Sequence, residues 1–363
     1  MIFNKYLAAA SACCLLMIGS TAGAKTPKHS PRYRVVPIDA RLKLDLGGNH
    51  CLNNSGVVVG RVYFPRAKDG SQPFQAYRWE KGKLSSLGVS ETDLPSSYAT
   101  AINDRGHIVG TITVQPSEAM FHSWGRAFFS KQSQWQDLSK LLTDEVSYGV
   151  AVNNTGDVAI AAQVLSMLPV DDPHPETELS SYLVRAGKLI PLGYGGVVAL
   201  NNKGQVLIGK QGKYFLWANQ QEIEAGPPTV GDIILSDMND HRQMIGKRRR
   251  IPEKRPEVGQ YGAFLYESGH MTYLTHDPES IPTSLNSKGQ IVGNFSLPHT
   301  RTQPQVLHAF LWQKGKFSDL NSLVSPKQGW VFRDARCISD RGQIVGTGTY
   351  RGKPSGFLLT PVR

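Results

Sequence analysis

The sequence predicts an all-β protein built from a motif that recurs seven times, and two observations carry this prediction. The first is a ten-residue template, seen in AINDRGHIVG (Ala101–Gly110) and SLNSKGQIVG (Ser284–Gly293). It reads as a small residue, an aliphatic residue, Asn, a polar pair, Gly, and an apolar run closed by a second Gly. The second is an aromatic-aliphatic segment, a polar turn and a further apolar segment after each copy, as in HAFLWQKGKFSDLN (His308–Asn321). A fixed internal period of this kind indicates a repeat protein.

The template itself is typical of a β-hairpin, because two aliphatic runs flank a short polar turn. Asn and Asp bond to their own backbone in turns, and Gly supplies the positive φ that the returning strand needs. The turn glycine is missing from the fifth copy, where Arg242 replaces it, so we expect that turn to be strained or built differently. In the other copies it stands at Gly56, Gly106, Gly156, Gly204, Gly289 and Gly342.

The two signatures together give four strands per repeat. The turn glycines recur every (342 − 56)/6 residues, about 48, which is the size of a β-propeller blade. The last copy ends at SGFLLTPVR without a fourth strand, while residues 33–46 carry an unpaired strand ending in LDLGG. We therefore predict a seven-bladed β-propeller of four-stranded blades, in which residues 33–46 complete the last blade and protect its edge. The alternative, an open β-solenoid, should not leave complementary deficits at its two ends.

The first 24 residues are typical of a cleaved signal peptide. Lys5 precedes an apolar stretch, Tyr6–Ile18, and Ala22-Gly23-Ala24 matches a cleavage site. The apolar stretch is too short to span a bilayer well. Acylation of Cys13 is an alternative, for which the preceding residues are a poor match.

The predicted organisation is a signal peptide over residues 1–24, a polar leader over 25–32 and one propeller domain over 33–363. No later segment approaches ~18 uninterrupted apolar residues, so we expect no transmembrane segment. The mature protein is predicted to be exported, periplasmic or extracellular, and monomeric.

The formal net charge is +11, from 40 Lys and Arg against 29 Asp and Glu. A basic protein favours acidic partners, such as an anionic polysaccharide, a membrane surface or nucleic acid. An exported protein rarely meets nucleic acid, so nucleic acid ranks last. The competing interpretation is a basic soluble protein whose charge is scattered.

Beyond the signal segment, the cysteines are Cys51 and Cys337, which occupy the same template position in the first and last copies. A closed ring would make these copies neighbours, and an oxidising compartment would allow a disulfide between them. The alternative is two small core residues at a position where other copies carry Ala or Ser.

The two half-motifs, recurring in register over nearly the whole mature chain, resemble the HAF repeat proteins, a bacterial family of extracellular repeats. The family name matches His308-Ala309-Phe310, while the second copy has Arg126 in place of the His and the fourth has Lys213-Tyr214. The resemblance implies export and a repeat fold. It implies no activity and no catalytic residues.

No strong catalytic, metal or cofactor motif is present, and we predict no cofactor. Gly204–Lys210 resembles a phosphate-binding loop, but Gln211 stands where Ser or Thr would hold Mg²⁺, so the segment is the repeat hairpin. The turn Asn residues are predicted to be structural rather than calcium ligands. One register of the second signature is predicted to pack aromatic rings between blades: Trp79, Phe128, Trp217, Phe264 and Trp312.

Candidate binding residues lie in the links between the second and third strands, which vary most among the copies and share one propeller face. Tyr98, Tyr148 and Tyr194 could rim the same mouth. The candidate ligand-binding residues are Arg66, Lys68, His122, Trp124, Arg248, Arg249, Arg250, His299, Arg301 and Trp330.

The predicted function is an exported binding module that recognises an anionic glycan or another envelope component, such as an envelope protein. One alternative is a propeller glycoside hydrolase or lyase, with Asp171 or Glu118 as acid or base. Such an enzyme needs two carboxyls at a defined separation, which the sequence does not reveal. A second alternative is a structural surface protein. Asp171, Asp172, His174 and Glu176 could hold a divalent metal, although the adjacent prolines favour an extended exposed loop.

Overall fold

The computed structural model divides the chain into two units, residues 1–30 and 31–363, and the residues it describes all belong to the second. The predicted signal peptide and most of the leader lie outside them. In the described part of the chain, no helix is long and apolar enough to cross a membrane. The described residues are 32–38, 44–46, 50–66, 68, 70, 72–89, 96–114, 124–132, 134–142, 145–164, 179–228, 233–248, 262–298 and 305–362.

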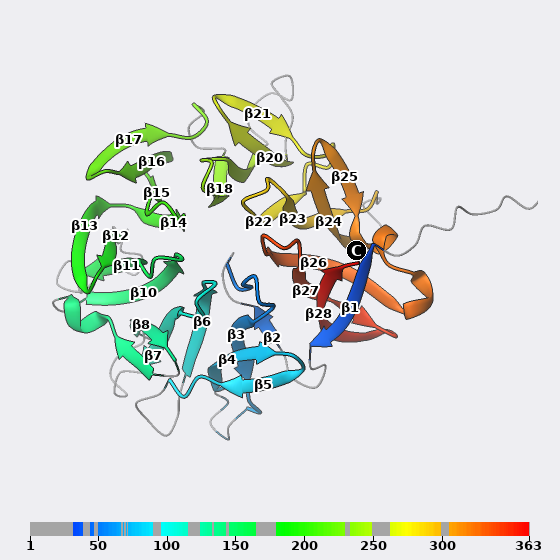
Figure 1. Cartoon of the computed structure of the whole chain (residues 1–363), viewed down its shortest axis with the longest axis horizontal. Helices are drawn as coiled ribbons and strands as arrows, with labels where there is room; N and C mark the ends of the chain where they lie inside the picture. Colours follow the sequence, from blue (N-terminus) through cyan, green and yellow to red (C-terminus); the bar gives the residue numbers. More distant parts are fainter. Residues whose placement is uncertain are drawn as a thin grey trace, which may run out of the picture. The chain divides into compact units, whose positions relative to one another are not determined.

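The described residues are almost entirely β-strand, and the sheets lie side by side around a common centre (Figure 1). Three short 3-10 helices interrupt the strands: η1 (Ser139–Leu141), η3 (Leu320–Leu323) and η4 (Pro326–Gln328). Five sheets have four antiparallel strands each, in the hydrogen-bonded orders β1-β28-β27-β26 (Tyr33–Ile38, Lys353–Pro361, Ile344–Tyr350, Trp330–Ile338), β10-β11-β12-β13 (Glu145–Val152, Val158–Val164, Ser180–Arg185, Lys188–Tyr194), β14-β15-β16-β17 (Gly196–Leu200, Val206–Lys210, Lys213–Ala218, Gln221–Ala225), β18-β19-β20-β21 (Ile233–Met238, Met244–Arg248, Gly262–Glu267, His270–Tyr273) and β22-β23-β24-β25 (Ile281–Leu285, Ile291–Ser296, Leu307–Gln313, Lys316–Asp319).

The sixth sheet has eight strands and contains two antiparallel groups of four. A single parallel pair, Phe74 opposite Ser96, joins the two groups. The first group is β2 (Leu44–Leu46), β3 (Val58–Tyr63), β4 (Phe74–Glu80) and β5 (Lys83–Ser86), and the second is β6 (Ser96–Ile102), β7 (Ile108–Val114), β8 (Trp124–Lys131) and β9 (Gln134–Asp137).

The N-terminal strands separate at the point where the sequence predicted one continuous ending. Strand β1 pairs with β28, from Tyr33 opposite Pro361 to Ile38 opposite Gly356, and so supplies the fourth strand of the last sheet. Strand β2 instead pairs with β3, with Leu44 opposite Val62. The prediction for residues 42–46 was therefore wrong: this segment belongs to the first copy.

The template turns adopt the predicted conformation, with the turn glycines at positive φ, such as Gly106 at 77° and Gly289 at 70°. Arg242 takes the same left-handed conformation at φ 60°. Its N–H donates to Asn239 O at 3.0 Å, as Gly289 N–H donates to Asn286 O at 3.1 Å. The fifth turn is thus built like the others, and a side chain occupies a backbone conformation that favours glycine.

Replacing Arg242 with glycine is expected to raise the free energy of unfolding by about 1 kcal/mol, because the left-handed conformation costs a non-glycine residue about that much. Urea denaturation followed by circular dichroism measures the change. The reciprocal substitution Gly289→Ala should lower stability by a similar amount. An Arg242→Gly variant that is less stable than the parent protein would show that contacts of the arginine side chain outweigh the strain.

The second template glycine is required for space. A Cβ atom at Gly293 would lie 2.0 Å from Ile281 O and 2.8 Å from the ring of Phe310. At Gly110 it would lie 2.1 Å from Tyr98 O and 2.7 Å from the ring of Phe128. The Phe of the second signature therefore packs over the glycine that closes the first, which couples the two half-motifs.

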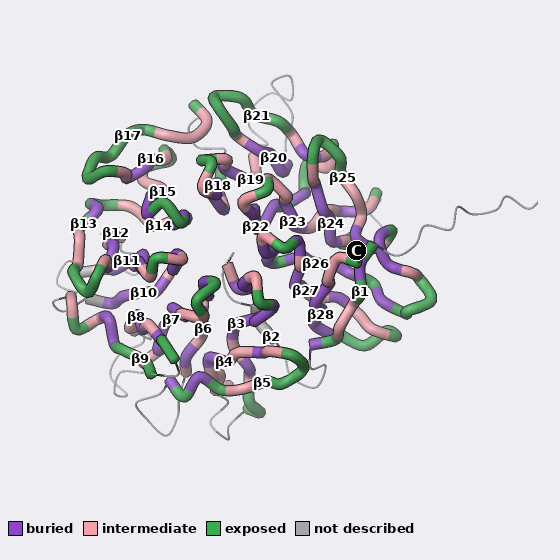
Figure 2. The backbone as a smooth tube through the Cα atoms, viewed as in Figure 1, coloured by how far each residue is buried: buried purple, intermediate pink, exposed green. Residues whose placement is uncertain are grey.

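Side chains along the third strands alternate between neighbouring sheets, as Figure 2 shows in the buried segments. Phe310 and Trp312 pack with Ile245 and Ala263 of the preceding sheet, whereas Leu311 packs toward the following one. The predicted aromatic packing between sheets is therefore confirmed. The prediction of one register was wrong. Phe128 and Phe264 lie opposite template glycines, while Trp79, Trp217 and Trp312 lie two positions further along and face the same side.

The His of the His-Ala-Phe triplet has a structural partner. His308 Nδ1 lies 2.7 Å from Asp319 Oδ2 across the β24–β25 hairpin. In the second copy Arg126 Nη1 donates to Asp137 Oδ2 at 3.1 Å in the corresponding place. Arginine at that position thus preserves the bridge to the carboxylate of the fourth strand.

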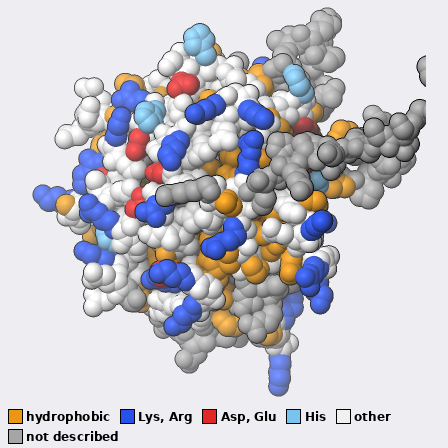
Figure 3. Space-filling model, turned by 45° about the vertical axis from the view of Figure 1, so that its right-hand side comes forward, with side chains coloured by type: hydrophobic (Ala, Val, Ile, Leu, Met, Phe, Trp, Pro, Cys, Tyr) orange, Lys and Arg blue, Asp and Glu red, His pale blue; other side chains and the backbone are white. Residues whose placement is uncertain are grey.

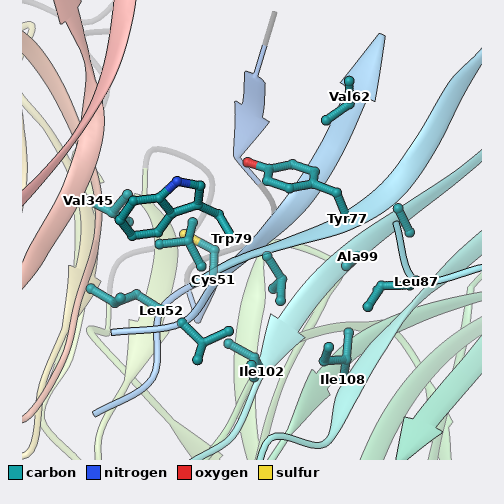
Figure 4. Close-up of a cluster of buried hydrophobic side chains, with 14 of the residues drawn as sticks. Cys51, Leu52, Val62, Tyr77, Trp79, Leu87, Ala99, Ile102, Ile108 and Val345 are labelled. Atoms are coloured by element: carbon teal, nitrogen blue, oxygen red, sulfur yellow. The ribbon is translucent and has the colours of Figure 1, made fainter. Parts of the chain in front are cut away.

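Cys51 and Cys337 form the predicted disulfide, with Cα atoms 5.9 Å apart. Both residues are fully buried in a cluster that includes Trp79 and Val345 (Figure 4). The bond joins the first and last template copies, 286 residues apart in the sequence.

Candidate functional site

The template turns meet around one cavity of about 90 Å³, here called the turn-side cavity. Residues of all seven copies line it. Strands β6, β10, β14, β18, β22 and β26, which lead into these turns, lie nearest the centre in Figure 1.

The template asparagines link each copy to the next, and we call them the asparagine relay: Asn53, Asn103, Asn153, Asn201, Asn239 and Asn286. Each Oδ1 accepts hydrogen bonds of 2.8–3.1 Å from backbone N–H groups two and four residues further on in its own turn. Each Nδ2 donates to the backbone oxygen at the same position of the next copy, at 2.7–3.3 Å, and the relay ends at Ser339 O. The relay thus has a structural role, as the sequence predicted, and it also connects neighbouring sheets.

The following template position forms the polar rim of the turn-side cavity: Asn54, Asp104, Asn154, Asn202, Asp240, Ser287 and Asp340. Asn54 N–H donates to Asp104 Oδ1 at 2.8 Å, and Ser287 N–H donates to Asp340 Oδ1 at 2.8 Å. Arg341 N–H donates to Asn54 Oδ1 at 3.1 Å, which joins the last copy to the first. Its side chains are thus held largely by neighbouring copies. Within the described residues, no group of His, Cys, Asp or Glu is arranged to hold a metal ion.

Six innermost strands carry a β-bulge at the same place, which the sequence analysis did not foresee. Thr100 and Thr283 use this position to donate to the next sheet, to Gly149 O at 2.7 Å and Ala335 O at 2.6 Å. The bulged residues are Thr100, Val150, Val198, Ser236, Thr283 and Arg336.

A second cavity, of about 280 Å³, lies toward the opposite ends of the innermost strands and is here called the loop-side cavity. Its lining combines two phenol rings with the backbone of the bulged strand β10. Burial and the neighbouring Tyr98 both raise the pKa of Tyr148, so its phenol stays neutral. The lining residues are His50, Tyr98, Thr100, Tyr148, Gly149, Val150, Ala151 and Val198.

His50 lines both cavities and contacts a carboxylate of a distant copy. Its Nε2 lies 3.0 Å from Asp237 Oδ1, which joins the first copy to the fifth. Asp237 is fully buried, and it also accepts from Met238 N–H at 2.8 Å and Leu285 N–H at 2.9 Å. The pair therefore lies between the two cavities.

Three carboxylates decide the protonation of His50. Burial by itself lowers its pKa, but the charge of Asp237 and the hydrogen bond to it outweigh burial, with smaller contributions from Asp340 and Asp240. The net result is a pKa above the ordinary value of 6.5. The imidazole consequently stays protonated to higher pH than a free histidine.

The described candidate residues from the sequence come from three different sheets. Arg66 and Lys68 are exposed in the β3–β4 link, where Arg66 Nη1 donates to Gly70 O at 2.9 Å. Arg248 ends β19 and donates to the Tyr273 hydroxyl at 3.4 Å. Trp124 begins β8. The candidates that lie outside the described residues are His122, Arg249, Arg250, His299 and Arg301, as do the metal and acid-base candidates Glu118, Asp171, Asp172, His174 and Glu176.

Trp330 does not fit the predicted role at the rim. Its side chain is buried, and its ring lies 4.9 Å from Tyr350 and 5.7 Å from Phe332 between ring centres. Tyr98 and Tyr148 do line the loop-side cavity, whereas Tyr194 is 56% exposed and does not. The sequence reasoning missed His50 and Asp237. The available signal was that each departs from the template, at the bulge position and at the small-residue position.

No protein-family model matches the sequence, and no curated protein matches it. Solved structures do match. The acylaminoacyl peptidase of Pyrococcus horikoshii superposes with a TM-score of 0.55 at 8% identity, over 87% of this chain and 51% of that one. The chain thus spans about half the length of that peptidase. The β-propeller domain of the Trilobed protease from Pyrococcus furiosus, described as having an open velcro topology, superposes with a TM-score of 0.54 at 8% identity, over 88% and 94%. At such identities the similarity establishes the fold alone: the chain is a β-propeller.

Proposed function

We propose that this protein is an exported β-propeller of seven blades, closed into a ring, that acts as a binding or interaction module. The observation that carries the proposal is the difference between the two ends of the channel. At the turn end, hydrogen bonds between copies occupy the polar rim. At the other end a larger cavity, lined by Tyr98 and Tyr148, adjoins the face that bears the variable links. A rigid scaffold usually carries its function on such variable loops.

Three contacts support the closed ring of seven blades. The five four-stranded sheets and the two groups within the eight-stranded sheet would be the blades. Strand β1 pairs along its whole length with β28, Arg341 N–H donates to Asn54 Oδ1, and Cys51 is bonded to Cys337. This arrangement would differ from the open topology described for the Trilobed protease domain.

Export is supported by the signal-like segment at residues 1–24 and by the disulfide, because disulfides persist in oxidising compartments. We also propose membership of the HAF repeat family. The bridge from His308 to Asp319, and its Arg126 to Asp137 counterpart, give a physical reason for a basic residue before the Ala-Phe pair.

The proposed ligand is an anionic glycan or another envelope component, including an envelope protein, bound on the face with the variable links. The net charge of +11 and the exposed Arg66 and Lys68 support it. On the face in Figure 3, Lys and Arg side chains are spread out rather than gathered into one patch, which favours contact with an extended polymer over contact with a small anion. A glycosidase would require two carboxyls about 5–10 Å apart in the loop-side mouth.

A glycan array probed with the mature protein at ~50 and ~500 mM salt tests the proposal, because salt screens exposed charge contacts. We expect binding to anionic glycans at the lower salt that falls at least tenfold when Arg248, Arg249 and Arg250 are replaced with glutamine. A control variant with Lys81, Lys314 and Arg351 replaced with asparagine removes the same charge from outer hairpin turns and should retain binding. Equal losses in the two variants, or no glycan bound at either salt concentration, would contradict the glycan proposal.

A further inference from the structure

The loop-side cavity has the size and chemistry of a site for a single small ring. Its volume of about 280 Å³ would hold about nine water molecules, somewhat less than the pockets that take drug-sized ligands. Two phenol rings and aliphatic side chains supply apolar surface, and the bulge at Val150 leaves a backbone residue unpaired in the sheet ladder. The cavity therefore suits a ligand with both an apolar face and hydrogen-bonding groups.

Packing fixes both tyrosines in place. The Tyr98 ring lies 6.4 Å from Phe74 and 5.6 Å from the guanidinium of Arg61, which holds it against the first copy. Tyr148 packs so closely on Gly125 that a Cβ atom there would lie 2.7 Å from the tyrosine ring. A ligand that stacks on these rings would lose little side-chain entropy in the protein.

His50 supplies a hydrogen-bonding group at the floor. Its Nε2 is directed to Asp237, and within the described residues its Nδ1 makes no hydrogen bond. Because the raised pKa favours the protonated ring, Nδ1 carries a hydrogen that it can donate. A hydroxyl oxygen is a suitable acceptor.

The charges around the floor exclude an anionic group. Asp237, Asp240 and Asp340 all act electrostatically on His50, so three carboxylates surround one imidazolium. A carboxylate or sulfate entering the cavity would meet a net negative field. The charge complement of the exposed basic links is thus reversed in the channel.

We propose that the loop-side cavity binds one uncharged pyranose ring, with its C–H face on Tyr98 and Tyr148 and a hydroxyl accepting from His50 Nδ1. Aromatic rings with polar edges suit this combination of apolar face and hydroxyl groups. The inference rests on the proposed function as a glycan-binding module and names the sugar at its centre: the residue that enters the channel is neutral, even where the rest of the polymer is anionic.

Isothermal titration of the mature protein with methyl glycosides of glucose, galactose, mannose and N-acetylglucosamine, and with methyl glucuronide, tests the proposal. We expect at least one neutral glycoside to bind at least tenfold more tightly than the uronide, with little effect of salt. Tyr148→Ala and His50→Val should each weaken that binding about tenfold or more. Tyr98→Phe, which keeps the ring, should retain it. Tyr194→Ala, which removes an exposed ring outside the cavity, should also leave it unchanged.

Thermal melts of each variant separate loss of the site from loss of the fold. If no neutral glycoside binds, if the uronide binds best, or if Tyr148→Ala binds as tightly as the parent protein, the proposal is wrong. Anionic-polymer binding that depends on Arg248–Arg250 but persists in Tyr148→Ala would leave the proposed function standing while this subsite fails. Glycoside binding that survives the arginine replacements, with no polymer bound, would give the opposite result.

Discussion

Replacing Cys51 and Cys337 together with alanine is expected to lower the free energy of unfolding by about 5 kcal/mol. The disulfide closes a loop of 286 residues, and a long closed loop restricts the unfolded chain more than a short one. Alanine is the residue that Ala101, Ala151 and Ala199 place at the same template position, so the substitution should disturb packing little. The loss should therefore come mainly from the freed unfolded chain.

Urea denaturation of the oxidised parent protein, the reduced parent protein and the double-alanine variant measures this effect. Reduction should bring the parent protein close to the variant, while the variant itself should not respond to reductant. Equal midpoints for the oxidised protein and the variant would mean that the disulfide adds nothing to the closure already provided by β1–β28 pairing.

Local structure could be predicted from the sequence because its determinants lie within one repeat. The Asn-x-x-Gly turns, the four strands per copy and the burial of Trp79 and Phe264 follow from short patterns. The disulfide could be predicted because the same template position carries Cys in two copies. In each case a local signal is repeated often enough to be recognised.

Partner choice was harder to predict because periodicity gives strands but not their neighbours. The three residues of β2 fit the ending of an outer strand as well as an inner one, and only the pairing of Leu44 with Val62 decides between them. The aromatic register was wrong for a related reason. Phe128 and Trp79 stand two residues apart on one strand face, so both satisfy a pattern of buried large rings.

The candidate site was missed because it arises between copies. The asparagine relay, the bulges and the His50–Asp237 pair each join residues tens to hundreds of positions apart. Each copy examined alone gives no sign of them. Two departures from the template, His50 and Asp237, were visible in the sequence, but only the structure brings them within 3.0 Å.

Asp237→Ala is expected to lower the free energy of unfolding by about 3 kcal/mol, because it strips partners from three buried or half-buried donors. Met238 N–H, Leu285 N–H and the His50 imidazole all donate to this fully buried carboxylate. Denaturant titration measures the loss. Asp240→Asn, a change on the exposed polar rim, is the control and should cost well under half as much. A small effect of Asp237→Ala would mean that water replaces the carboxylate at little cost.

A double-mutant cycle separates the histidine from the backbone donors. His50→Thr and Asp237→Ser restore residues that other copies carry at these positions, as Thr100 and Ser284 do. The double variant should therefore lose less stability than the sum of the two single changes.

This coupling should depend on pH, with a sign fixed by the raised pKa of His50. A raised folded-state pKa contributes stability that is fully present below the ordinary value near 6.5 and is lost as pH rises through the folded-state value. The coupling energy between His50 and Asp237 should thus be larger at pH 6 than at pH 9, where a neutral imidazole can still donate one hydrogen bond. A coupling that is constant over this range would show that the hydrogen bond, and not the charge of the imidazolium, holds the first copy to the fifth.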